Sequence, residues 1–187
     1  MSESNIEEEL RAVVVGELRP LEKPIEICDY DDEWPQRFER ERRRIEAALG
    51  DRALQIEHVG STSVPGLAAK PIVDIVLVVE DTTDESAYVP ALEAAGYVLR
   101  IREPDWFEHR MFRERETNVN LHVLSRGCEE VDKMLLFRNW LRENDADREL
   151  YERTKRELAQ RNWKFGQEYA NAKTAVVEEI VARARAG

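Results

Sequence analysis

A short stretch of the sequence combines a glycine, three hydroxyls, a lysine and a carboxylate. The run Gly60-Ser61-Thr62-Ser63 is followed by Lys70 and then by Asp74, which interrupts the otherwise apolar run 72–79. A buried, ionised carboxylate without a partner is strongly unfavourable, so Asp74 must be neutralised, bound to a metal or placed at a solvent-facing strand end. This predicts a functional site at Asp74; the alternative is a structural Asp that caps a turn or pairs with an arginine.

The glycine and hydroxyl run has the composition of a phosphate-binding turn. Glycine allows close backbone approach to a ligand, and free backbone N–H groups at the start of a helix suit phosphate oxygens. Lys70 would add a positive charge beside the phosphates, and His58, just before the run, is expected to orient it. The same composition is also typical of an ordinary surface turn, with Lys70 as solvated surface.

A second set of polar residues lies on the strand predicted at 119–123. Val119, Leu121 and Val123 alternate with polar residues, so His122 and Asn120 share one face of that strand. If this strand neighbours the strand of Asp74, the imidazole and the carboxylate face one cleft and form a plausible pair of divalent-metal ligands. The alternative is a structural histidine that makes only hydrogen bonds.

Four further residues are candidates for contacts with phosphate. Arg110 and Arg113 precede the His122 strand, and a guanidinium recognises phosphate with two parallel hydrogen bonds. Tyr169 and Lys173 share a helix face at i and i+4 and could close over the cleft. The alternatives are surface arginines and a tyrosine–lysine pair that packs on the outside of the molecule.

Hydrophobic periodicity predicts interleaved strands and helices followed by a run of helices. Strands are expected at 25–28, 54–59, 72–79, 97–101, 109–113 and 119–123, and helices at 31–50, 84–95, 129–143, 146–162 and 167–185. This order favours an α/β sheet with a helical C-terminal extension at about 129–187. Residues 1–20 are predicted to be a mobile tail with one short helix, and residues 21–187 a single domain.

Composition narrows the classes of partner. The net charge of −11 disfavours nucleic acid and anionic membranes as partners, although a local basic pocket can still bind one nucleotide. The N-terminus lacks the features of a signal peptide, and no apolar run is long enough to cross a bilayer, so the expected location is the cytoplasm. Cys28 and Cys128 are far apart in sequence, which makes a disulfide framework and a zinc–thiolate site improbable.

The eighteen-residue run from His58 to Ile75 resembles the signature of the GrpB family, a branch of the nucleotidyltransferase (DNA polymerase β-like) superfamily. Similar stretches occur at 29–35, 120–123, 137–142 and 169–173. The resemblance implies a small mixed sheet of the nucleotidyltransferase type, flanked by helices. It also implies a nucleotide or another phosphate-bearing small molecule as ligand.

In that superfamily a Gly-Ser pair precedes an Asp-x-Asp or Asp-x-Glu pair and a third carboxylate, which together hold two Mg²⁺ ions. Gly60-Ser61 and Asp74 match this pattern. Val76 occupies the position of the second acid and His122 that of the third. Mg²⁺ prefers oxygen ligands and is poorly served by one carboxylate and one imidazole. Asp74 and His122 would therefore hold a single ion, Mg²⁺, Mn²⁺ or Zn²⁺, or none.

Three functions follow as hypotheses. The first is a nucleotidyltransferase that acts on an unknown acceptor, with Asp74 and His122 as catalytic and metal-binding residues. Residues 60–63, Lys70, Arg113 and Lys173 would then bind the nucleotide. The second is a non-catalytic nucleotide-binding or folding-assistance module, similar to the domain fused to dephospho-CoA kinase in some bacteria. The third is a phosphate-ester binder that uses a metal other than Mg²⁺.

Overall fold

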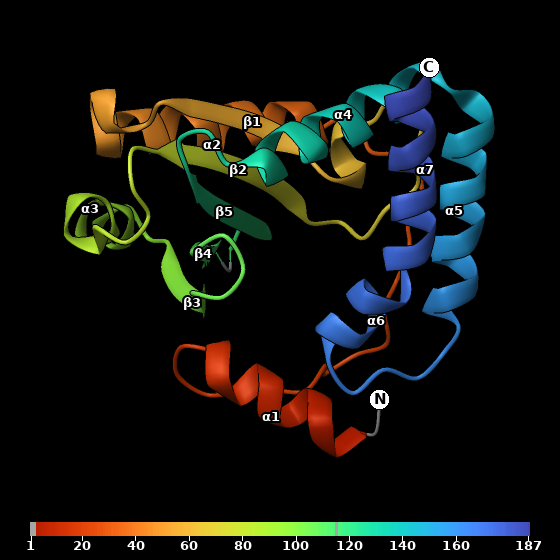
Figure 1. The fold of residues 1–187 in the computed structure, drawn as a ribbon, viewed down its shortest axis with the longest axis horizontal. Coiled ribbons are helices and arrows are strands. Elements are labelled where there is room, and N and C mark those ends of the chain that lie inside the picture. The colour runs from red at the N-terminus through yellow and green to blue at the C-terminus, as the bar shows by residue number, and fades with distance from the viewer. Residues whose placement is uncertain (1–2, 115) are drawn as a thin grey trace.

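The computed structural model describes residues 3–114 and 116–187 and contains one five-stranded mixed sheet flanked by helices (Figure 1). The order of strands across the sheet is β1-β2-β5-β4-β3. The strands are β1 (Gln55–Val59), β2 (Val73–Val79), β3 (Val98–Glu103), β4 (His109–Glu114) and β5 (Val119–Ser125). The mixed α/β sheet expected from the sequence is therefore confirmed.

The two central strands carry the polar residues singled out in the sequence. β2 and β5 run parallel, and the other three strand pairs are antiparallel. The β2–β5 register places Asp74 beside Asn120 and Val76 beside His122. Because side chains of paired residues point to the same face of a sheet, these four residues share one face.

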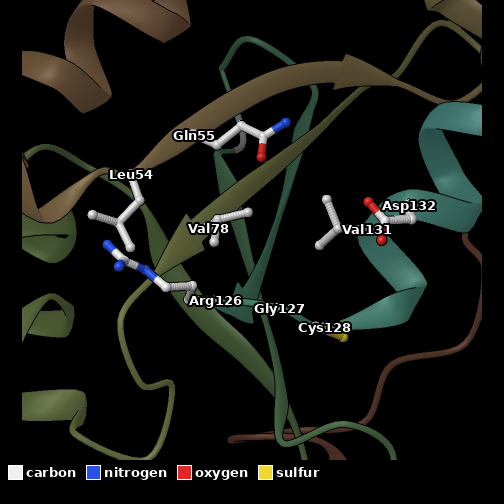
Figure 2. Close-up of a pocket in the computed structure, with 8 residues that line it drawn as sticks. All are labelled: Leu54, Gln55, Val78, Arg126, Gly127, Cys128, Val131 and Asp132. Atoms are coloured by element: carbon white, nitrogen blue, oxygen red, sulfur yellow. The ribbon is translucent and has the colours of Figure 1, made fainter.

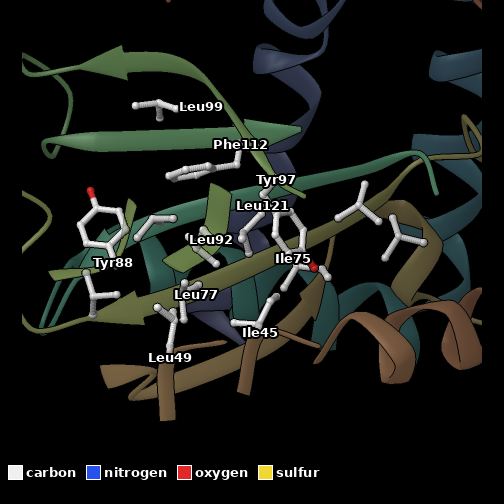
Figure 3. Packing of buried hydrophobic residues seen from close by; sticks show 14 of the residues in the cluster. Ile45, Leu49, Ile75, Leu77, Tyr88, Leu92, Tyr97, Leu99, Phe112 and Leu121 are labelled. Atoms are coloured by element: carbon white, nitrogen blue, oxygen red, sulfur yellow. The ribbon is translucent and has the colours of Figure 1, made fainter. Parts of the chain in front are cut away.

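The other face of the sheet is buried against α2 (Trp34–Leu49) and α3 (Val89–Ala94). Alternate residues of the central strands, among them Ile75, Leu77 and Leu121, pack there without solvent exposure, together with Ile45 from α2 (Figure 3). This apolar layer fixes which face of each strand is left for the polar residues.

The helical C-terminal part is made of four helices at one end of the sheet. They are α4 (Glu129–Glu143), α5 (Asp145–Ala159), α6 (Gly166–Ala172) and α7 (Thr174–Ala186). α5 and α7 lie side by side (Figure 1). α4 follows β5 in the chain and packs against α5, α7 and β1. α4 also covers part of the polar face, because Val76, Val78 and Leu124 pack under its Val131.

The N-terminal segment contains the short helix expected within residues 1–20. α1 (Glu3–Val13) contacts β3, and its Ile6 and Leu10 are buried against Phe165 at the start of α6. Val14 continues the chain with an isolated bridge to Ile101 at the β3 edge. Mobility of residues 1–20 stays a prediction.

Three expected elements differ from the structure. The strand at 25–28 was wrong: Ile25 packs toward Leu158 and Tyr169 of the helical part, and only Cys28 bridges to Ala69. Residues 84–95 form a short 3-10 turn followed by α3 and not one continuous helix. Pro90 has no N–H group, so it cannot donate the backbone hydrogen bond that a continuous helix would need at that position. Residues 167–185 form two helices that meet at Lys173.

Within the described ranges, every helix is too short or too polar to span a bilayer.

Candidate functional site

The Gly60 turn is built directly against the Asp74 carboxylate. Val59, the last residue of β1, pairs with Asp74, and Gly60 follows with φ 67° and ψ −174°. This backbone conformation is essentially restricted to glycine. A Cβ atom at position 60 would lie 2.6 Å from Oδ2 of Asp74, so the glycine also makes room for the carboxylate.

The three hydroxyls of the turn have different surroundings. Ser63 Oγ donates to the Gly60 carbonyl at 2.6 Å, and Thr62 Oγ1 lies 2.9 Å from Nε2 of His58. Both hydroxyls therefore stabilise the turn itself. In the part of the chain that the structure describes, the Ser61 hydroxyl makes no hydrogen bond and is half-buried. Ser61 is the hydroxyl of this run left available to a ligand.

His58 supports the turn from the opposite face of the sheet. Its ring stacks on Phe38 of α2 at a centroid distance of 4.9 Å and hydrogen-bonds to Thr62. Burial lowers the pKa of His58 to about 4, against the smaller opposing effect of the Asp74 charge, so the imidazole is neutral at pH 7. The contact with Thr62 agrees with the expected orienting role, which stays a prediction.

Asp74 is held in place by its neighbour on β5. Asn120 donates from Nδ2 to Oδ1 of Asp74 at 2.9 Å, and Nε of Arg113 on β4 donates to the side-chain Oδ1 of Asn120 at 3.3 Å. The Asp74 side chain is 30% exposed. Burial raises the pKa of Asp74, but His122, Asn120 and the charge of Lys173 outweigh that effect and hold the pKa below its usual value. The carboxylate is therefore ionised at pH 7.

His122 joins Asp74 to two residues of the β3–β4 hairpin. His122 Nε2 lies 3.7 Å from Asp74 Oδ1, and His122 Nδ1 lies 3.0 Å from Nε2 of His109. Nδ1 of His109 in turn lies 2.7 Å from Oε2 of Glu103. Burial, opposed by the hydrogen bond to Glu103, lowers the pKa of His109.

This order of partners fixes the tautomers when both rings are neutral. The Glu103 carboxylate only accepts, so His109 carries its proton on Nδ1 and accepts at Nε2. His122 must then donate from Nδ1, which leaves a lone pair on its Nε2 toward Asp74. The sequence did not predict these roles for His109 and Glu103; the signal was the alternation of β4, which places His109 on the face of Arg113.

Two lysines border Asp74 from the side of the helical part. Nζ of Lys173 lies 4.7 Å and Nζ of Lys70 lies 5.8 Å from the ring centroid of Tyr169, which is buried. Both lysines are half-buried, and within the described residues neither ammonium has a hydrogen bond or an ion pair. Burial and the charges of Lys173 and Arg113 lower the pKa of Lys70.

Arg110 does not belong to this cluster. It is three residues from Arg113, so it points to the other face of β4, where its guanidinium is buried and pairs with Glu85 at 2.7 Å. This placement corrects the expectation that Arg110 reaches a phosphate at the Asp74 site.

The residues at the site do not fit a pair of Mg²⁺ ions. Val76, in the place of a second acid, is fully buried under α4, and the described residues contain no group of three or more His, Cys, Asp or Glu arranged around a metal. Lys70 and Lys173 also disfavour a cation beside Asp74. One Mn²⁺ or Zn²⁺ ion on Asp74 and His122 stays a prediction.

Among the described residues, two of the cavities lie away from Asp74. One, of about 310 Å³, lies on the far side of the Gly60 turn between Tyr30, His58 and Arg142, whose guanidinium donates to the Ser63 carbonyl at 2.7 Å. The other, of about 280 Å³, lies between the β1–β2 edge and the start of α4 (Figure 2). Asp74 lines neither of them.

Comparison with known proteins places these features in a family. The family described as GrpB protein matches residues 24–183. A UPF0157 protein of Halalkalibacterium halodurans is 58% identical over 180 residues, which cover 96% of this chain and 92% of that protein. The crystal structure of the conserved protein GrpB from Enterococcus faecalis is 31% identical, with a TM-score of 0.73 over 85% of this chain and 96% of that one.

A third relative is an enzyme by name. A dephospho-CoA kinase of Mycolicibacterium paratuberculosis is 30% identical over 164 residues, which cover 74% of this chain and 40% of the kinase. The similarity therefore involves less than half of that protein.

Proposed function

This chain belongs to the GrpB family, and we propose that it binds the phosphates of a nucleoside triphosphate beside Asp74 and transfers a nucleotidyl group to an acceptor. The observation that carries the proposal is the pair of lysines beside Asp74, Lys70 and Lys173, whose ammonium groups make no hydrogen bond or ion pair with any described residue. Burial of an ammonium group is unfavourable unless an opposite charge compensates it, and the phosphates of a nucleotide would supply that charge.

Three cationic side chains and the Gly60–Ser63 turn would each bind part of the triphosphate. Lys70 and Lys173 act as point charges, whereas the guanidinium of Arg113 can bind two oxygens of one phosphate. Ser61 contributes its free hydroxyl. Because Asp74 itself is anionic, the phosphates must lie on the lysine side of the carboxylate, with the acceptor on the His122 side.

In the transfer step the acceptor hydroxyl oxygen attacks the α-phosphorus of the nucleotide. A new P–O bond forms, the bond between the α-phosphorus and the oxygen bridging to the β-phosphate breaks, and pyrophosphate leaves. The hydroxyl proton goes to Nε2 of His122, where the Asp74 carboxylate at 3.7 Å stabilises the imidazolium. The lysines stabilise the negative charge on the leaving pyrophosphate.

Label transfer tests this activity. The protein is incubated with ATP labelled in the α-phosphate and a fractionated mixture of small molecules and proteins, and labelled products are separated. We expect a product with the wild type and a loss of at least about a hundredfold with His122→Gln. The same product and rate with both proteins would contradict the catalytic role.

The second candidate function is a non-catalytic nucleotide-binding or folding-assistance module. The buried Val76 at the second acid position favours it, and so does the similarity to part of a dephospho-CoA kinase. The transferase would release pyrophosphate from the nucleotide, whereas the non-catalytic module would bind the nucleotide without converting it. Binding of ATP without release of pyrophosphate from any nucleotide, together with a stable protein partner in a pull-down, would favour the module.

A further inference from the structure

Two aromatic side chains are partly exposed in the turn between β3 and β4. Trp106 is 39% and Phe107 38% exposed, and their ring centroids lie 5.5 Å apart. Trp106 also contacts His109 edge-on at a centroid distance of 5.0 Å, and His109 stacks on His122 at 5.2 Å. A row of three rings therefore extends from this turn to the neighbourhood of Asp74.

The backbone of this turn is held in an unfavourable conformation. Phe107 and Glu108 have φ values of 55° and 50°, in the left-handed region that bulky residues seldom adopt. Such conformations persist only where the surroundings enforce them, and they are concentrated at ligand-binding and catalytic sites. The strain here keeps Trp106 and Phe107 in the turn, where both stay partly exposed.

Arg110 holds this turn, together with two backbone hydrogen bonds, from Trp106 to Glu103 and from His109 to Trp106. Its guanidinium donates to the Glu108 carbonyl at 2.9 Å and to the Glu108 carboxylate at 3.2 Å, while its Nε donates to Glu85 at 2.7 Å. With 7% exposure it is anchored inside the protein. This buried arginine, which the phosphate site does not use, therefore fixes the position of the aromatic pair.

We propose that Trp106 is the stacking surface for the base of the nucleotide whose phosphates lie at Lys70 and Lys173. The inference rests on the proposed function and adds the base subsite to it. Every base has an aromatic face, and stacking on an exposed indole ring needs no matching charge. The row of rings ends at His122, which lies 3.7 Å from Asp74, so a nucleotide with its phosphates at the lysines would extend past Asp74 and His122 to place its base on Trp106.

The test compares two ligands that differ in the base. Dissociation constants of ATP and of inorganic tripolyphosphate are measured by calorimetry for the wild type, Trp106→Ala and Trp106→Tyr. We expect Trp106→Ala to weaken ATP binding about tenfold, Trp106→Tyr to restore most of it, and tripolyphosphate binding to stay unchanged. Leu54→Ala, which removes an exposed apolar side chain on the β1 side of the sheet, is the control and leaves both affinities unchanged.

The outcomes separate the two proposals. If both ligands bind the wild type and Trp106→Ala leaves the ATP affinity unchanged, the base subsite is wrong while the phosphate site stands. If neither ligand binds the wild type, the proposed function fails and the base subsite with it. If Trp106→Ala weakens both ligands equally, Trp106 acts on the phosphate site and not on a base, which also overturns the inference. Circular dichroism of each variant confirms that it is folded.

Discussion

Nε2 of His109 lies 3.0 Å from Nδ1 of His122. The buried imidazole of His109 on β4 therefore determines which nitrogen of a neutral His122 on β5 carries the proton. The Glu103 carboxylate at the other end of His109 gives the chain of hydrogen bonds a direction. When both imidazoles are neutral, the side of His122 that faces Asp74 is left with a lone pair.

His109→Phe should release the tautomer of His122. Phenylalanine keeps the ring stack but cannot accept the Nδ1 proton, so we expect a mixture of both neutral tautomers at His122. Nitrogen-15 NMR of the imidazole above its titration range distinguishes the two forms. Glu103→Gln is the matched control, because its amide oxygen still accepts from His109. An unchanged tautomer in His109→Phe would refute the relay.

Gly60→Ala should destabilise the fold far more than Gly66→Ala. At position 60 alanine meets both a glycine-only conformation and the Asp74 carboxylate at 2.6 Å, whereas position 66, with φ 78°, has open space around it. We expect a loss of ~3 kcal/mol for Gly60→Ala and ~1 kcal/mol for Gly66→Ala in urea unfolding. Equal losses would show that Asp74 does not restrict position 60.

Val76→Asp should not restore a second acid. The side chain is fully buried under α4, so the new carboxylate would be enclosed among Val59, Val78 and Leu124. We expect the free energy of unfolding to fall by about 3 kcal/mol or more. Val98→Asp, at a site with 46% exposure, should cost less than about 1 kcal/mol. A stable Val76→Asp protein with new Mg²⁺ binding would contradict this account of the site.

Lys155 should make stability rise with pH above neutrality. Its ammonium donates to the Ala68 carbonyl and is 2% exposed; burial, with smaller effects of Lys173 and Arg156 and opposed by Glu152, lowers its pKa from 10.5 to about 7. Between these two values the unfolded chain binds more protons than the folded one, so folding is favoured increasingly as pH rises.

Lys155→Met isolates this effect, because the other titrating groups are retained. From about pH 7 to about pH 10, wild-type stability should rise relative to Lys155→Met by an amount on the order of a few kcal/mol. The measurement is urea unfolding at both pH values. Parallel pH profiles of the two proteins would show that the folded-state pKa of Lys155 is not lowered.

Local sequence patterns predicted which residues share a face of a strand, because the alternation of side chains depends only on the strand itself. The alternation of residues 119–123 predicted that Asn120 and His122 share one face of their strand, whereas their position beside Asp74 depended on the β2–β5 pairing, which the structure shows. Arg110 was misassigned because residues three apart on a strand point to opposite faces, so Arg110 and Arg113 cannot both face Asp74. The partners of His109 depend on the β3–β4 register, which shifts between Leu99 and Ile101, and no local pattern reveals such a shift.

The lysine pair shows the same limit from the helical side. The i, i+4 spacing predicted that Tyr169 and Lys173 lie together, which the structure confirms. That Lys70 meets the same ring depends on how α6 packs against the start of β2, a long-range contact that the sequence does not encode locally. Nor did residues 1–20 predict that α1 packs on Phe165, since the apolar residues involved are few.

The central claim is that an anionic ligand binds between Lys70 and Lys173 beside Asp74. Its most direct test is the dissociation constant of ATP, measured by calorimetry without added metal, for the wild type, Lys70→Ala, Lys173→Ala and the double variant. Lys133→Ala, which removes a lysine already paired with Glu130 on α4, is the control. We predict that each single variant weakens binding about tenfold, that the double variant weakens it further and that the control binds as the wild type does. Wild-type affinity in the double variant would contradict the account.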